Sequence, residues 1–271
     1  MVGSALREIC TASGDTVFAY DHKKLDISQP DDVRRAVNAS QPDAVINCAA
    51  WTDVDGCESD ADHAFAANAR GPQNLAAAAR DANAAFVTIS TDYVFEGSKE
   101  GFYTQEDIPN PQSVYGRSKL EGERLSLEMN PATIIVRSGF IFGPGGRNFL
   151  STVIDRARKG EHLKAISDSY GTPTYSYDLA RRLRELAQLN QPRIFHVANS
   201  GDGASYVEFA REAIRSAGLG EPAIAGILTD SLSRPAPRPR NSRLRCLYSK
   251  GLGLSPLPNW KDSLKEFAMR S

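Results

Sequence analysis

The sequence predicts an α/β fold, a doubly wound parallel sheet with a smaller C-terminal lobe. Short β-branched or apolar runs alternate with longer stretches in which apolar residues recur at helical spacing. This alternation is typical of βα units, which build parallel sheets. The length of 271 residues suffices for one full α/β core with a small appended lobe.

The first half of the chain supplies most of the predicted sheet. Asp31 and Asp32 follow Pro30, a combination that favours a helix start because proline fits the first turn and carboxylates suit the positive end of the helix dipole. We expect strands at residues 16–20, 44–48, 85–90 and 133–137, and helices at 31–39, 61–80 and 114–128.

The second half mixes sheet completion with the smaller lobe. A Gly-Pro-Gly-Gly turn cluster at 143–146 begins it, so we divide the chain into residues 1–142 and 143–271, with the two parts interleaved in the sheet. We expect helices at 149–158, 177–189 and 206–217, and strands at 162–166 and 194–198.

Residues 233–243 form the one compositionally biased segment. They contain three prolines and four arginines. Proline disrupts a helix interior and is excluded from central strands, so this segment is predicted to be a loop with a strong positive field.

Composition excludes several classes of function. Charged residues make up 24% and hydrophobic residues 41%, with a formal net charge of -1, which is typical of an ordinary globular protein. No apolar run approaches the roughly 18 residues of a membrane span, and residues 1–10 lack the features of a signal peptide. We expect a cytoplasmic protein that binds neither nucleic acid nor a membrane.

The cysteines and histidines indicate no disulfide framework and no metal site. Cys10, Cys48, Cys57 and Cys246 stand at no metal-ligand spacing, and four cysteines are few for this length. The four histidines are equally scattered. We expect free, mostly buried thiols and no bound metal.

Tyr115 and Lys119 are candidate catalytic residues. Four residues apart in a predicted helix, they project from one face. A neighbouring ammonium stabilises a phenolate, so we expect Lys119 to lower the pKa of Tyr115 from its reference value of about 10. The same spacing occurs on many solvated helices, which is the ordinary alternative.

Thr91 is a third candidate because it follows the apolar strand predicted at 85–90. In doubly wound sheets, ligands bind beyond the carboxyl ends of the strands, where the Thr91 hydroxyl would lie. An ordinary strand-end Ser/Thr turn is the alternative.

Three segments, at residues 90–95 (Ser-Thr-Asp-Tyr-Val-Phe), 110–111 (Asn-Pro) and 114–123, combine hydroxyl residues with the Tyr-x3-Lys pair. They resemble the catalytic signature of the dTDP-4-dehydrorhamnose reductase family of extended short-chain dehydrogenase/reductases, and the resemblance continues in order along nearly the whole chain. Residues 47–55 and Asn68 match its cofactor-side motifs. Its substrate-side motifs resemble residues 148–149, 168, 171–174 and 238–244.

The resemblance implies a Rossmann-like NAD(P)-binding domain over residues 1–142 and a substrate-binding lobe within 143–271. It also implies hydride transfer from NADPH or NADH to the C4 keto group of a nucleotide-linked deoxysugar, of the type that converts dTDP-4-dehydro-L-rhamnose to dTDP-L-rhamnose. Tyr115 would donate the proton, Lys119 would hold the nicotinamide ribose and tune Tyr115, and Thr91 would bond the carbonyl oxygen.

The same resemblance assigns binding residues. Arg238 and Arg240 suit a diphosphate because guanidinium groups bind phosphate oxygens in bidentate fashion, although a solvated basic turn is the alternative. A nucleotide sugar is the expected partner, and a homodimer stays open. The cofactor-binding residues implied are Gly3, Asp26, Cys48, Ala49, Ala50, Thr52, Asn68, Ser90, Tyr115 and Lys119. The substrate-binding residues implied are Thr91, Asp92, Tyr93, Asn148, Phe149, Thr172, Arg238 and Arg240.

Tyr93 bears on the type of reaction. Related dehydratases carry a glutamate after the Thr-Asp pair because elimination of water needs a second acid/base, and Tyr93 stands there in this chain. Simple reduction is favoured, and epimerisation stays open.

The N-terminus departs from the family pattern of an apolar strand followed by Gly-x-x-Gly-x-x-Gly. Only the third glycine is present, as Gly3, and the first strand is missing. Each unmet buried backbone group costs about 1–3 kcal/mol, against a total stability of roughly 5–15 kcal/mol. We hypothesise that the sequence starts at an internal methionine of a longer protein.

Cofactor preference and substrate affinity stay open. Asp21 would favour NAD by bonding a ribose 2′-hydroxyl, whereas His22, Lys23 and Lys24 would attract the 2′-phosphate of NADP. Arg245 stands where relatives are usually neutral or acidic, which bears on substrate affinity.

Two other functional classes compete with the reductase. One is a non-catalytic, NADP-binding regulatory subunit resembling the β subunit of methionine adenosyltransferase, which shares the fold and the Arg-Pro-Arg-Asn type of loop. The other is a truncated, inactive relic. Retention of Thr91, Tyr115 and Lys119 excludes neither.

Overall fold

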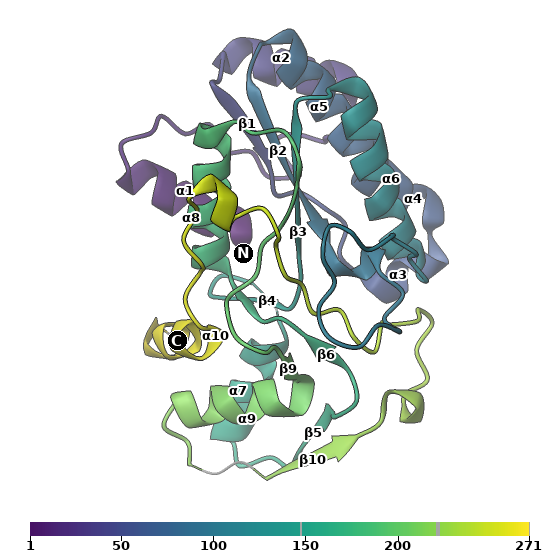
Figure 1. The fold of residues 1–271 in the computed structure, drawn as a ribbon, viewed down its shortest axis with the longest axis vertical. Helices are drawn as coiled ribbons and strands as arrows, with labels where there is room; N and C mark the ends of the chain where they lie inside the picture. Colours follow the sequence, from purple (N-terminus) through teal and green to yellow (C-terminus); the bar gives the residue numbers. More distant parts are fainter. Residues whose placement is uncertain (147, 221–222, 271) are drawn as a thin grey trace.

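A parallel sheet of four strands forms the centre of the computed structural model, which describes residues 1–146, 148–220 and 223–270. The strands are β1 (Ala44–Asn47), β2 (Ala85–Thr91), β3 (Thr133–Ser138) and β8 (Ile194–His196). They lie in the order β1-β2-β3-β8, and every neighbouring pair is parallel (Figure 1). Their carboxyl ends therefore meet at one edge of the sheet.

Helices cover both faces of this sheet. Helices α1 (Val2–Ala12) and α8 (Ser176–Leu189) lie on one face, and α2 (Pro30–Ser40), α5 (Gly71–Asp81) and α6 (Val114–Met129) on the other (Figure 1). Adjacent residues of β2 point to opposite faces: Phe86 packs with α2 and α5, and Val87 packs with α1 and α8. Both faces are buried, so apolar residues of the central strands point to both sides of the sheet, while polar residues such as Ser90 and Arg137 stand near the carboxyl ends.

The helix predicted at 61–80 is present with a local irregularity. Helix α4 (Ala61–Phe65) passes through a π-helical turn, η1 (Ala66–Arg70), into α5. The short α3 (Val54–Ser59) precedes it. Such π-turns occur frequently at functional sites, and this one contains Asn68.

The smaller lobe packs below the carboxyl ends of the sheet strands (Figure 1). Strands β5 (Leu163–Ile166) and β10 (Ile224–Ile227) pair in parallel and pack with α7 (Phe149–Arg158) and α9 (Tyr206–Ser216). Helix α10 (Trp260–Arg270) packs against α9. Two pairs of short strands join the lobe to the sheet: β4 (Ile141–Phe142) with β7 (Thr174–Tyr175), and β6 (Tyr170–Gly171) with β9 (Ala204–Ser205).

The strand predicted at residues 16–20 is wrong. These residues form no strand, and the side chains of Phe18 and Tyr20 are 55% and 48% exposed. A short β-branched and apolar run favours a strand, but an extended segment becomes one only when a neighbouring strand satisfies its backbone groups. Within the described residues, β1 is the edge of the sheet and pairs with β2 alone.

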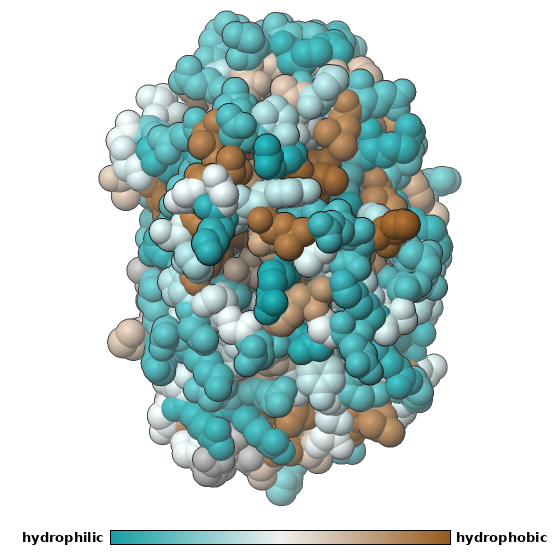
Figure 2. Space-filling model, viewed as in Figure 1, coloured by the Kyte–Doolittle hydropathy of each residue, from teal (hydrophilic) through white to brown (hydrophobic). Residues whose placement is uncertain are grey.

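The other predicted strands and helices are present with boundaries shifted by at most a few residues. Residues 233–243 are a loop, as predicted. Figure 2 shows hydrophilic residues over most of the visible face, with apolar residues gathered mainly in its middle and upper parts. None of the helices in the described residues is long and apolar enough to cross a membrane.

Candidate active site

Thr91, Tyr115 and Lys119 are brought together where β2 ends against α6. Thr91 is the last residue of β2, and Tyr115 and Lys119 lie on α6. The Thr91 hydroxyl and the Tyr115 phenol are in a hydrogen-bonding interaction. A β-carbon placed on Gly116 would lie 2.4 Å from the carbonyl oxygen of Tyr93, so only glycine lets the start of α6 pack this closely on the segment after β2.

The pKa of Tyr115 moves opposite to our expectation. Burial raises it to about 12, while the hydrogen bond with Thr91 acts in the lowering direction. Lys119 is not among the groups that shift it. The physical reason is that removal of the phenol from water disfavours its charged form, so Tyr115 is held protonated.

Lys119 is a buried cation, only 4% exposed. Its Nζ donates a hydrogen bond of 2.7 Å to the carbonyl oxygen of Ile89. Burial lowers its pKa to about 8, while Glu123 and Cys48 act in the raising direction. The electrostatic interaction with Cys48 places Lys119 beside the segment that follows β1.

That segment presents its backbone at the carboxyl end of β1. Ala49, Ala50 and Thr52 are exposed or partly exposed, and Cys48 is partly buried. The side chain of Asn68 holds the segment in place, since it accepts a hydrogen bond from the Trp51 amide at 2.8 Å and donates one to the Trp51 carbonyl at 3.0 Å.

Asn68 also joins this segment to α6. Its Nδ2 donates a hydrogen bond of 3.0 Å to Oγ of Ser118, the residue just before Lys119. A β-carbon on Gly122 would lie 2.1 Å from the Asn68 carbonyl oxygen, which again requires glycine. Asn68, fully buried, therefore sets the distance between the two sides of the predicted cofactor site.

The remaining predicted cofactor residues are spread more widely. Gly3 lies in the first turn of α1 rather than before a helix, and a β-carbon there would contact Cys48 at 3.6 Å. Asp26 accepts hydrogen bonds from the amide and hydroxyl of Ser28. Asp21 accepts hydrogen bonds from the amides of Lys23 and Lys24, which fixes a turn.

Ser90 belongs to a buried polar network. Its hydroxyl donates a hydrogen bond of 2.5 Å to Glu123 of α6, and Glu123 forms an ion pair of 2.7 Å with Arg137 of β3. Both charged side chains are 4% exposed. The Arg137 guanidinium also lies 5.3 Å from the centre of the Phe95 ring. This network locks α6 to two neighbouring strands.

Asp92 is a nearly inaccessible carboxyl group directly after Thr91. It is 2% exposed, and the Thr91 hydroxyl donates a hydrogen bond of 3.1 Å to its Oδ1. Burial raises its pKa to about 6, with polar contacts from Ser242 and Thr91 acting in the lowering direction. A β-carbon on Gly139 would lie 2.3 Å from this carboxyl group.

Aromatic side chains from three elements line the region next to Tyr115. The Tyr93 ring lies 5.8 Å from the Tyr115 ring, and its hydroxyl interacts with that of Tyr206 at the start of α9. The Tyr206 ring contacts Phe140 at 4.5 Å and Phe149 at 5.0 Å. Phe140 has a backbone φ of 46°, a strained conformation for a bulky residue of the kind that clusters at functional sites.

The two arginines predicted to bind a diphosphate are each in ion pairs. Arg238 contacts both carboxylate oxygens of Asp55 on α3, and Arg240 pairs with Asp230 at 2.6 Å and with Asp168 at 3.8 Å. Arg238 also acts electrostatically on Tyr93, which brings it to the site. Arg240 is the more exposed of the two.

Asn148 and Thr172 have structural roles in this conformation. Asn148 caps α7, with its Oδ1 accepting hydrogen bonds from the amides of Leu150 and Ser151. Thr172 is buried and accepts a hydrogen bond from the Leu244 amide at 2.9 Å. Phe149, the first residue of α7, reaches the site through Tyr206.

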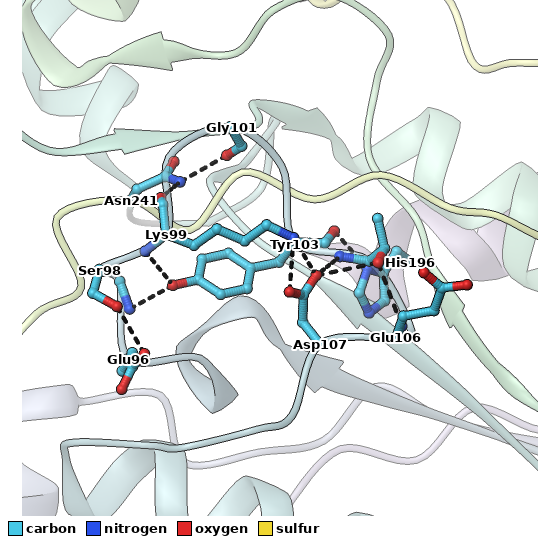
Figure 3. A network of polar contacts seen from close by, with 11 residues as sticks. Glu96, Ser98, Lys99, Gly101, Tyr103, Glu106, Asp107, His196 and Asn241 are labelled. Carbon is cyan, nitrogen blue, oxygen red and sulfur yellow. Dashed lines mark hydrogen bonds and ion pairs between the residues drawn. The ribbon is translucent and has the colours of Figure 1, made fainter.

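A polar network ties residues 96–107, which follow β2, to residues 233–243, called here the arginine-rich loop, and to Arg245 just after it (Figure 3). Asn241 donates hydrogen bonds to the carbonyl oxygens of Lys99 and Gly101, and the Tyr103 carbonyl oxygen accepts one from the Arg245 amide. His196 also contacts that oxygen through Nδ1 at 3.1 Å. The loop that carries Arg238 is thus held against the end of β2.

Tyr206 and Phe140 are the site-side residues that sequence reasoning missed, whereas Asp55 and Ser242 lie within the motifs at 47–55 and 238–244 but were given no role of their own. The Ser-x-x-Glu capping box at 205–208 predicts a helix start, but not that its first residue faces Tyr93. A group of side chains suited to hold a metal ion is not found within the described ranges.

Comparison with known proteins gives a consistent result. The family model described as RmlD substrate binding domain matches residues 1–271. The dTDP-4-dehydrorhamnose reductase of Streptomyces griseus is 38% identical over 98% of this chain and 89% of its own length. The Bacillus subtilis spore coat polysaccharide biosynthesis protein SpsK is 36% identical over 94% of this chain and 89% of its own length.

Comparison with solved structures also finds similarity to dTDP-4-dehydrorhamnose reductases. A dTDP-4-dehydrorhamnose reductase from Clostridium acetobutylicum superposes with a TM-score of 0.95 at 38% identity, covering 99% of this chain and 95% of that one. The dTDP-4-dehydrorhamnose reductase of Bacillus anthracis, solved in complex with NADP, superposes with a TM-score of 0.95 at 31% identity. The match covers 100% of this chain and 95% of that one.

Proposed function

The chain belongs to the RmlD substrate-binding domain family, and from this premise we propose that it is an NAD(P)H-dependent oxidoreductase of the dTDP-4-dehydrorhamnose reductase type. It reduces the C4 keto group of a nucleotide-linked deoxysugar. One observation in this chain carries the proposal: a protonated, partly buried phenol and a buried ammonium stand on one helix face beside a hydroxyl at the carboxyl end of β2.

The residues present fit a nicotinamide cofactor chemically. An ammonium has three N–H donors, and the bond from Lys119 to Ile89 accounts for one, so others are available for ribose hydroxyls. The exposed residues Ala49 and Ala50 lie at a strand end, where dinucleotides bind in sheets of this kind. When bound, the cofactor supplies the hydride.

Within this proposal, each catalytic residue has one task. Tyr115, kept neutral by burial, donates its proton to the oxygen of the keto group as that oxygen gains negative charge. Thr91 donates a hydrogen bond to the same oxygen. Lys119 orients the ribose, and Asn68 maintains the separation between residues 48–52 and α6.

The substrate-side residues divide into those that contact the sugar and those that bind the diphosphate. Asp92, Tyr93 and Phe149 line the sugar region, with Tyr206 and Phe140 beside them. Arg238 binds a diphosphate oxygen in exchange for part of its contact with Asp55, and Arg240 contributes positive charge. We retain the proposed division of the chain into residues 1–142 and 143–271. We also propose that the protein is cytoplasmic and forms a homodimer, and light scattering of the purified protein tests the dimer.

The experiment is a turnover assay with purified protein, dTDP-4-dehydro-L-rhamnose and either NADPH or NADH. Substrate-dependent oxidation of the cofactor, with the reduced sugar identified by NMR, is the expected result. Cofactor binding by calorimetry without turnover would instead favour the regulatory subunit, and absence of binding would favour the inactive relic.

A further inference from the structure

The direction of one hydrogen-bond chain decides whether the proposed donors can act. The chain runs from the Tyr115 phenol to Oγ1 of Thr91 and on to Oδ1 of Asp92, the last step being 3.1 Å. The Thr91 oxygen also accepts a hydrogen bond from the Tyr93 amide at 3.2 Å. Thr91 has one hydroxyl proton, so it can donate to only one acceptor at a time.

An ionised Asp92 directs this chain away from the substrate. A carboxylate only accepts hydrogen bonds, so it takes the Thr91 proton. Thr91 then has no proton for the keto oxygen, and its lone pairs compete with that oxygen for the Tyr115 proton. A neutral Asp92 reverses the chain: its own hydroxyl donates to Thr91, and both the Thr91 and the Tyr115 protons are free for the substrate.

We propose that Asp92 is a positioning residue that acts in its neutral form, donating its proton in a hydrogen bond to Thr91 and so turning the Thr91 and Tyr115 protons toward the keto oxygen. This inference rests on the proposed function and adds a condition to it. No bond to Asp92 is made or broken in the reaction: the keto carbon receives the hydride and the keto oxygen receives the Tyr115 proton.

The surroundings of Asp92 fit a neutral acid. Its Oδ2 has no hydrogen-bond partner in the described part of the chain, and a buried carboxylate with an unpartnered oxygen is costly, whereas a carbonyl oxygen without a partner costs less. Gly139 from the end of β3 closes one side, since a β-carbon there would overlap the carboxyl group.

The groups that face Asp92 from the other elements are also uncharged. They are Tyr115 from α6, Tyr206 from α9, Tyr93 from its own segment and Ser242 from the arginine-rich loop. The cations Arg238 and Arg234 act on Tyr206, and Arg238 also on Tyr93, but neither is among the groups that shift the pKa of Asp92, and Arg238 is paired with Asp55.

Catalysis gives a second reason for neutrality. Negative charge develops on the keto oxygen during reduction, and a carboxylate one residue from Thr91 would repel it. Binding of cofactor and sugar displaces water, which disfavours the carboxylate further. An apolar site can hold an aspartic acid neutral at physiological pH so that it donates a hydrogen bond, as ketosteroid isomerase does in its oxyanion hole.

The test is the pH dependence of kcat/KM between pH 5 and 7.5, which reports groups of the free enzyme. This range stays below the pKa of Lys119, which is about 8. The pKa of Asp92 is about 6, so the active neutral form and the wild-type kcat/KM fall by about tenfold per pH unit above that value.

Asp92→Asn separates the two states of the carboxyl group, because an amide can donate to Thr91 at every pH. We expect that kcat/KM of this variant does not fall above pH 6 and exceeds the wild-type value at pH 7.5. Asp107→Asn is the matched control, because it removes a carboxylate that is paired with Lys99 outside the site. Its kcat/KM should fall above pH 6 as that of wild type does. A flat wild-type profile, a fall above pH 6 that persists in Asp92→Asn, or a folded but inactive Asp92→Asn overturns the proposal.

A second measurement does not depend on turnover or on the variant. Infrared difference spectra of the wild-type protein should show the carbonyl band of a neutral carboxylic acid at pH 5 that disappears by pH 8. Absence of that band overturns the inference even if the enzyme is active. Absence of turnover at every pH, with the band present, counts against the proposed function instead.

Discussion

The Asp55 carboxylate accepts two hydrogen bonds from the Arg238 guanidinium, of 2.5 and 2.8 Å, and this bidentate ion pair joins α3 to the arginine-rich loop. The side chain of Arg238 is 15% exposed. The pair connects the dinucleotide side of the molecule to the substrate side, and it holds a guanidinium where the proposed diphosphate would bind.

We expect Arg238→Ala to raise KM for the nucleotide sugar by about tenfold to 100-fold, because a hydrogen bond to a charged group contributes about 1.5–3 kcal/mol. The change in kcat should be small, since the diphosphate that Arg238 would bind takes no part in the hydride or proton transfer. Steady-state kinetics at constant ionic strength measures both. Arg234→Ala removes one exposed positive charge from the same loop and is the control. Equal effects of the two variants would mean that only the general positive field matters.

Tyr115→Phe should reduce kcat by about 100- to 10,000-fold, the usual contribution of a positioned general acid. The ring and its packing against Tyr93 are preserved, so circular dichroism and cofactor binding should not change. Tyr20→Phe removes an exposed phenol and should leave turnover intact. Normal turnover of Tyr115→Phe would assign proton donation to another group.

Arg137→Met should lower the free energy of unfolding by about 3–5 kcal/mol, because Glu123 would be left as an unpaired buried charge. Urea denaturation measures the loss. The double variant Arg137→Met with Glu123→Leu removes both charges and should recover part of the stability. If the double variant is as unstable as the sum of the single variants, the two charges do not depend on each other.

His196 should make the protein acid-sensitive. Burial lowers its pKa to about 3, so the unfolded chain takes up a proton below about pH 6.5 that the folded chain does not. The free energy of unfolding is therefore lost as the pH falls from about 6.5 toward 3, by up to about 1.4 kcal/mol per pH unit. Urea titrations at pH 4 to 7 should show a shallower slope for His196→Gln. His162→Gln, at an exposed histidine, should retain the wild-type slope.

The sequence predicts the central sheet well because β2 and β3 are short apolar runs between strong helical patterns. It fails at residues 16–20, where the pattern favours a strand but the described structure offers no neighbouring strand. Strand formation depends on a partner, and a partner cannot be read from a local pattern.

The candidate site, like the fold, contains residues that the sequence predicts and residues that it does not. Tyr115 and Lys119 are predictable because helical spacing alone places them on one face. Tyr206 and Ser242 are not, because they reach Tyr93 and Asp92 only through the packing of distant segments. The expected direction of the Tyr115 pKa shift is also wrong, since burial of the phenol depends on that same packing.

The position of β8 has a consequence for how the protein is made. This strand completes the sheet by pairing with β3, yet α7, β5 and α8 lie between the two in the chain. Contacts between distant segments form late and slow folding. During synthesis on the ribosome, β3 therefore has one edge without its partner until residues 194–196 emerge, and an unpaired strand edge exposes the nascent chain to aggregation for that interval.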